Sequence, residues 1–186
     1  MAVANVKGFT LIELLVAIVI IAILASIGVP EFRTFLLNTQ IKTASEAINN
    51  GLQLARGEAV RRNTPVQFNL GAGTGWTVGC EIPIADADGD DVDECPAVIQ
   101  SRSAGEGSAS AIVTTEPAGA TTVTFNGLGR VIANDDGTPS ITRFNIDMPS
   151  SLLDAERSKD MSILTAGGSI RMCDPNNATP GDARAC

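Results

Sequence analysis

The feature that most limits how this chain can fold is an apolar run near its amino terminus. From Leu11 to Val29 the only charged residue is Glu13. A helix rises about 1.5 Å per residue, so the run is about as long as the hydrocarbon core of a bilayer is thick. It predicts one membrane-length helix, in which Glu13 needs a partner because a charge at a membrane helix centre costs about 2.5–3.5 kcal/mol or more. An ordinary signal anchor that tolerates this residue near its end is the alternative.

The residues before the run supply a partner for the carboxylate. The stretch Lys7-Gly8-Phe9-Thr10-Leu11-Ile12-Glu13 resembles the cleavage and methylation motif of type IV pilins and type II secretion pseudopilins. In that family a prepilin peptidase cuts after the residue that matches Gly8 and methylates the new amino terminus, here Phe9. The cut places an α-ammonium about one helical turn before Glu13. The resemblance implies that Glu13 pairs with the amino terminus of a neighbouring subunit, and that Pro30 kinks the helix.

Beyond Pro30 the uniformly apolar pattern becomes amphipathic. Apolar residues then recur at helical spacing, at Leu37, Ile41, Ala44, Ile48, Leu52, Ala55 and Ala59. The helix is predicted to end at Asn63-Thr64-Pro65, since proline disfavours helix in the residue before it. From Phe9 to about Arg62 it would be about 80 Å long, and its second half needs a sheet laid on the apolar stripe.

The rest of the chain reads as short strands separated by Gly, Pro, Asn and Asp clusters. Nine runs are predicted, at 65–70, 75–80, 97–101, 111–115, 121–126, 130–134, 141–148, 161–165 and 169–173. Asn126-Gly127 marks a hairpin turn, because these residues accept the positive φ angles of a tight turn. The predicted fold class is α+β and pilin-like, a long helix packed on an antiparallel sheet. We expect a cleaved leader (1–8), a transmembrane and assembly helix (9–30), an amphipathic helical half (31–64) and a head domain (65–186).

Three segments further along the sequence indicate which branch of the pilin family the chain resembles. The segment Leu52–Val66 is similar to the end of the helix in the GspH/FimT branch, the minor pilins and minor pseudopilins. The segments Val123–Arg130 and Ile170–Pro175 resemble FimT or FimU-type minor pilins of type IV pili. The resemblance implies a subunit that primes assembly of a type IV pilus or sits at its tip, with other major and minor pilins and the prepilin peptidase as partners. It would be held in the inner membrane with its head in the periplasm, and later in the pilus at the cell surface. A minor pseudopilin of a type II secretion system is the alternative.

The charged end of the predicted helix has a simpler interpretation than ligand binding. Arg56, Glu58, Arg61 and Arg62 are expected to solvate an exposed helix face. Ion pairs there would contribute a few tenths of a kcal/mol.

The composition argues against an enzyme. The 186 residues include no histidine, which removes the commonest general base and zinc ligand. A catalytic cysteine is the rival idea, but it would lack a histidine to activate it. Cys80, Cys95, Cys173 and Cys186 suggest disulfides and an oxidising compartment. If nearest neighbours pair, two disulfides close short loops, and each would stabilise the fold by about 3 kcal/mol. The sequence leaves two other pairings of the four cysteines open.

Two further patterns are candidate binding sites. Asp86, Asp88, Asp90 and Asp93 alternate around a glycine and could supply oxygens to Ca²⁺, although the spacing is not that of an EF-hand and a solvated acidic loop is the alternative. No other cofactor is expected.

The second pattern concerns DNA. Some FimT-type minor pilins are DNA-uptake receptors with a C-terminal GRxR motif, and Gly168-Ser169-Ile170-Arg171 keeps half of it. Arg171 and Arg184 are therefore candidate DNA contacts, although the net charge of −8 opposes DNA binding.

Overall fold

The computed structural model describes residues 9–85, 94–177, 179 and 181–186. The described residues form one α-helix, α1, and nine β-strands. The chain divides into two compact units, one before Leu37 and one from Leu37 to Cys186, and each is described by itself. The second unit contains the later half of α1 together with every strand.

Helix α1 spans Leu11–Arg62 and continues through Pro30 without ending. In the first unit its apolar side chains are exposed, and the helix is long and apolar enough to cross a membrane. The predicted end at residue 62 is confirmed. Asn63 adopts a left-handed conformation, with φ of 51°, and the Thr64 N–H donates to the Ala59 carbonyl at 3.3 Å. This is a common way to terminate a helix, and asparagine tolerates that conformation.

All nine predicted strands are present. They are β1 (Val66–Leu70), β2 (Trp76–Cys80), β3 (Gln100–Arg102), β4 (Ile112–Glu116), β5 (Thr122–Phe125), β6 (Val131–Ile132), β7 (Arg143–Asp147), β8 (Met161–Ala166) and β9 (Ser169–Cys173). Among the described residues, these strands pair only in the antiparallel sense, as predicted.

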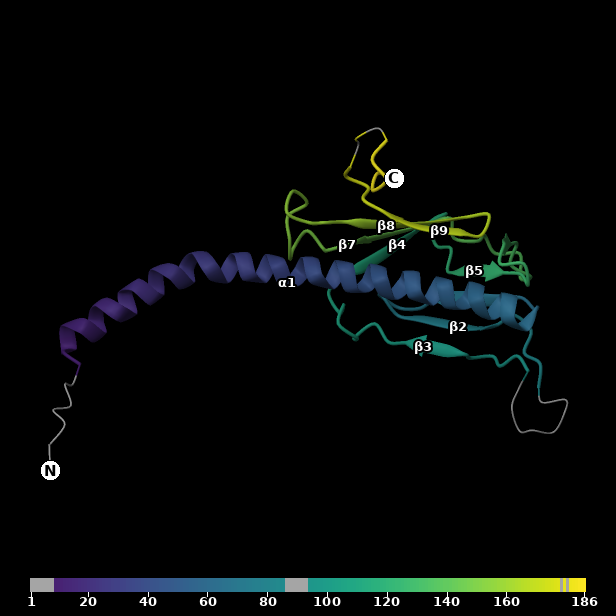
Figure 1. The fold of residues 1–186 in the computed structure, drawn as a ribbon, viewed down its shortest axis with the longest axis horizontal. Helices are drawn as coiled ribbons and strands as arrows, with labels where there is room; N and C mark the ends of the chain where they lie inside the picture. Colours follow the sequence, from purple (N-terminus) through teal and green to yellow (C-terminus); the bar gives the residue numbers. More distant parts are fainter. Residues whose placement is uncertain (1–8, 86–93, 178, 180) are drawn as a thin grey trace, which may run out of the picture. The chain divides into compact units, whose positions relative to one another are not determined.

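The strands form two sheets, whereas the sequence predicted one. One sheet has the order β3-β2-β1-β5-β6 and the other β4-β7-β8-β9. The chain turns between β4 and β5 and changes sheet, and a parallel bridge joins Thr122 of β5 to Ser140, which precedes β7 in the chain. In Figure 1, β7, β8 and β9 lie above the later half of α1 and β2 and β3 lie below it. The alternation of apolar residues shows which face of a strand is buried, but it does not show which other strand pairs with it. The sequence therefore predicted one sheet where the structure has two.

The core lies between the helix stripe and both sheets. All seven stripe residues predicted from the spacing are buried, and Ser45 and Gly51 are buried with them. Phe68 from the first sheet packs edge-to-face on Phe144 from the second, with ring centroids 5.7 Å apart. The two sheets therefore share one core with the helix.

The hairpin between β5 and β6 is present, but its turn differs from the prediction. The positive φ lies at Gly129, at 70°, rather than at Asn126-Gly127. The Asn126 side chain instead accepts hydrogen bonds from the N–H groups of Leu128 and Arg130, both at 3.0 Å. Gly127 is required for another reason, since a Cβ there would lie 2.5 Å from Asn63 Oδ1. The turn is thus packed tightly against the end of α1.

Candidate functional site

The amino-terminal end of α1 is built around Thr10 and Glu13. The Thr10 N–H and hydroxyl donate to Glu13 Oε2, at 3.4 and 3.5 Å, and the Glu13 N–H donates to Thr10 Oγ1 at 3.3 Å. This reciprocal pair is a capping box, which satisfies N–H groups that have no partner at a helix start. Sequence reasoning missed it, although the Thr-x-x-Glu spacing signals it. The carboxylate also lies where the helix dipole favours negative charge.

Both Phe9 and Glu13 are accessible at this end. Phe9 is 85% exposed, and the Glu13 hydrogen bonds are long and exposed. Gly8, the other residue of the predicted cleavage site, lies outside the described residues. The geometry leaves the Glu13 carboxylate able to accept a second, cationic partner.

The cysteines pair as nearest neighbours. Cys80 bonds to Cys95 and Cys173 bonds to Cys186. The first bridge joins the end of β2 to the chain that returns after residue 93. The second anchors the C-terminal loop on β9, and Figure 1 shows this loop rising from the side of the sheet away from the helix. No described cysteine is a free thiol.

The two candidate DNA-contacting arginines are engaged within this C-terminal loop. Arg171 Nη2 donates to the carbonyls of Ala185 and Cys186, at 3.1 and 3.4 Å. Arg184 forms an ion pair with Asp182, at 3.0 Å. The hydrogen bond from Arg184 holds the pKa of the Asp182 carboxyl well below its usual range. DNA binding by this pair stays a prediction, and these internal contacts would compete with phosphate.

The charged end of α1 is more enclosed than predicted. The Glu58 carboxylate binds Arg61 at 2.6 Å and Arg62 at 2.9 Å, and the side chains of Glu58 and Arg62 are only 15% and 16% exposed. Arg62 also donates to the Glu94 carbonyl. These hydrogen bonds, chiefly the one from Arg61, lower the pKa of Glu58 although burial opposes them. The sequence could not show this, because the covering segment arrives from a distant part of the chain.

The candidate calcium ligands Asp86, Asp88, Asp90 and Asp93 lie outside the described residues. Among the residues that the structure does describe, no cluster of three or more acidic, cysteine or histidine side chains could hold a metal ion. Calcium binding by the acidic loop therefore stays a prediction.

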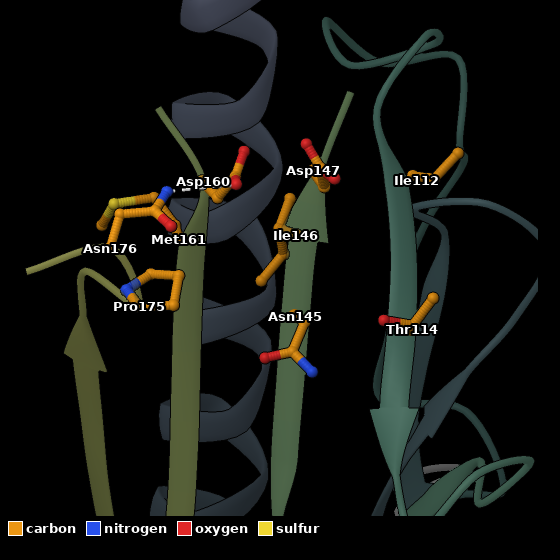
Figure 2. Close-up of a pocket in the computed structure, with 9 residues that line it drawn as sticks. All are labelled: Ile112, Thr114, Asn145, Ile146, Asp147, Asp160, Met161, Pro175 and Asn176. Carbon is orange, nitrogen blue, oxygen red and sulfur yellow. Dashed lines mark hydrogen bonds between the residues drawn. The ribbon is translucent and has the colours of Figure 1, made fainter. Parts of the chain in front are cut away.

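A cavity of about 230 Å³ opens where β7 ends and β8 begins. Figure 2 shows Asp147 and Asp160 at the ends of these strands, with Ile112 of β4 on one side and Pro175 and Asn176 of the C-terminal loop on the other. Ser158 Oγ lies 3.1 Å from Asp147 Oδ1 and 2.5 Å from Asp160 Oδ1. Burial, followed by the neighbouring carboxylate, raises the pKa of Asp160. Sequence reasoning missed this pair, since nothing in the local pattern indicates that the two aspartates meet.

Comparison with known families identifies the chain. Residues 44–167 match the family described as type II transport protein GspH, which is more than half of the sequence. The chain belongs to the GspH family. Residues 3–29 of this GspH-family protein match the prokaryotic N-terminal methylation motif, which includes the Thr10–Glu13 capping box. The predicted membership of the GspH/FimT-like branch of type IV pilins is confirmed.

Solved structures share the fold. The type IV minor pilin FimU of Pseudomonas aeruginosa matches with a TM-score of 0.50 and 17% sequence identity, over 75% of this chain and 92% of that chain. A second crystal form of FimU gives a TM-score of 0.48 at 17% identity, over 75% and 97%. The match at a TM-score of 0.50 confirms the pilin-like fold predicted from the sequence. Membership of the GspH family, together with the methylation motif, gives the chain the role of a minor pilin or pseudopilin.

Proposed function

We propose that this chain is a minor subunit of a type IV pilus that primes assembly or occupies the filament tip. The observation that carries the proposal is the methylation motif placed on an exposed apolar helix whose first turn holds Glu13. Cleavage after Gly8 and methylation at Phe9 would leave a cationic amino terminus beside the capping box. That terminus is a suitable partner for the carboxylate of an adjacent subunit.

The membrane segment has two successive environments in this mechanism. Before assembly, the exposed side chains of Leu11 to Val29 contact lipid, with the head in the periplasm. On entry into the filament they exchange lipid for the helices of other pilins, at little cost because both surroundings are apolar. Glu13 then gains the charged partner, which makes the transfer favourable. Pro30 removes one helix hydrogen bond beyond this segment and allows a bend there.

The test is the substitution Glu13→Ala. We expect normal membrane insertion and head folding, because the residue lies outside the core, but at least a tenfold loss of the subunit from sheared filaments. Glu46→Ala is the matched control, since it removes an exposed carboxylate from the same helix. Wild-type incorporation of the Glu13 variant would disprove the role. Mass spectrometry of the native protein should also find methylated Phe9 as the first residue.

A pseudopilin of a type II secretion system is the second candidate, and the family description itself favours it. In both candidates the amino-terminal helix anchors the subunit in the membrane and offers Glu13 as a charged partner to its neighbour. Deleting the gene separates them, because loss of piliation with normal secretion supports the pilus assignment. Loss of secretion with normal piliation supports the pseudopilus.

A further inference from the structure

The turn between β5 and β6 is packed against two other elements of the head. One is the end of α1, since a Cβ on Gly127 would lie 2.5 Å from Asn63 Oδ1. The other is the turn between β8 and β9, since a Cβ on Gly168 would lie 2.4 Å from the Gly129 carbonyl oxygen. These close approaches hold the tip of the hairpin in one position.

The tip presents an apolar side chain on this fixed support. Leu128 is 79% exposed, although it lies between two glycines that are packed on neighbouring elements. Val60 of α1 is 51% exposed, and its Cγ2 atom would lie 3.2 Å from a Cβ on Gly129. Because the backbone of the turn is already fixed, little conformational freedom would be lost when a partner buries Leu128.

Two guanidinium groups border this apolar tip. Arg56 lies against the turn, because its Nε atom would be 3.1 Å from a Cβ on Gly129, and Arg130 directly follows that glycine in the chain. Both arginines are exposed. Among the described residues, neither side chain takes part in an ion pair. We call Leu128, Val60, Arg56 and Arg130 the hairpin knob, an apolar protrusion with a positive border.

The chemistry of the knob fits a protein surface better than a nucleic acid. Its two guanidinium groups could neutralise only two phosphates, and so few contacts give weak binding to DNA. Arg61 and Arg62, at the same end of α1, are already bound to Glu58. A protein pocket can bury the apolar tip and place carboxylates at its edge, where guanidinium groups form paired, charge-assisted hydrogen bonds. Arginine is also enriched among the residues that dominate binding at protein interfaces.

We propose that the hairpin knob docks into an apolar pocket bordered by carboxylates on the head of a different pilin subunit. Leu128 would be the buried anchor, and Arg56 and Arg130 would bind carboxylates at the edge of the pocket. Opposite charges around an apolar centre favour one orientation of the two heads.

The partner is a different subunit and not a second copy of this chain. Head-to-tail contacts between identical copies close into rings or continue as a stack, whereas a subunit that primes assembly or occupies the tip is not repeated along the filament. The inference rests on the proposed function and adds to it the surface by which the head would recognise its neighbour.

The test is photo-crosslinking of the full chain in its host cell. A benzophenone side chain replaces Leu128, and the crosslinked peptides of the purified chain are sequenced by mass spectrometry. We expect crosslinks to the head of another protein that carries the N-terminal methylation motif, at least tenfold above those from a benzophenone at Val98, which is also exposed. A benzophenone at Val60 repeats the measurement with the sequence of the turn intact. The proposal fails if neither position crosslinks to such a subunit, or if the crosslinks join only copies of this chain.

Charge reversal tests the border of the knob. Arg56→Glu with Arg130→Glu should lower the crosslink yield from Leu128 at least fivefold, and lysine in place of the acidic residues beside the crosslink on the partner should restore it. Lys42→Glu is the control, because it reverses another exposed cation of α1, and it should leave the yield unchanged. A thermal melt checks folding, and Arg56→Gln with Arg130→Gln replaces the double reversal if that variant is unfolded. An unchanged yield in the folded variant would overturn the proposal.

The docking contact and the proposed function fail in different ways. Glu13 and the knob belong to different units of the chain, so each can be changed without the other. If incorporation depends on Glu13 but the knob gives no crosslink, the docking contact alone is wrong. If Glu13→Ala enters filaments normally, the proposed function is wrong whatever the knob binds.

Discussion

Two glycines of α1 allow a direct test of how closely the helix approaches the sheet. Gly51 is buried against β1 and β2, and a Cβ there would lie 2.7 Å from Phe68 Cε2 and 3.0 Å from the Trp76 ring. Gly57 lies on the same helix, and a Cβ there would meet nothing within 4 Å. The same substitution, glycine to alanine, should therefore change stability in opposite directions at the two positions.

The magnitudes follow from two competing effects. Alanine is favoured over glycine inside a helix by about 1 kcal/mol. At Gly51 this gain is opposed by overpacking, which costs about 1–3 kcal/mol. The upper part of that range applies, because Phe68 is fully buried and contacts both Trp76 and Phe144. Gly51→Ala should lose about 1–2 kcal/mol, and Gly57→Ala should gain about 1 kcal/mol or slightly less.

Thermal unfolding of the oxidised full chain in detergent micelles measures both changes. For a compact unit of this size, 1 kcal/mol corresponds to about 2–4 °C in Tm. We expect Gly51→Ala to melt about 2–8 °C lower than the parent and Gly57→Ala about 2–4 °C higher. If Gly51→Ala were stabilised as much as Gly57→Ala, the close approach of helix and sheet would be refuted.

Three other changes test the head domain. Cys173→Ser with Cys186→Ser should lower the free energy of unfolding by about 3 kcal/mol, measured by denaturant titration, and an unchanged midpoint would contradict a stabilising role for this bridge. Glu58→Gln should destabilise the head at pH 7 by about 1 kcal/mol. Because the folded-state pKa of Glu58 is lowered, its contribution is present above the unfolded-state pKa and is lost as the pH falls through the folded-state pKa. The variant and the parent should therefore converge in acid, and a constant difference would contradict this. In a gel shift with double-stranded DNA, Arg171→Ala should behave like the parent, because the guanidinium is held by backbone carbonyls; a shift that the parent gives and the variant loses would assign Arg171 to DNA binding.

Several features of this protein could be predicted because they depend on local pattern. The apolar run and the seven-residue stripe on α1 follow from helical periodicity, and the strands follow from short runs bounded by turn residues. The nearest-neighbour disulfides also join residues that are close in sequence. Each of these signals is contained within a few turns or one loop.

Other features were decided only by tertiary structure. The division into two sheets, the enclosure of Glu58 and Arg62, and the meeting of Asp147 with Asp160 all bring together residues from separate segments. Gly51 illustrates the same limit, since a helix interior disfavours glycine and only the rings packed above it explain its presence. A sequence pattern specifies which face of an element is apolar. Which surface covers that face, and how closely, depends on the packing of the whole domain.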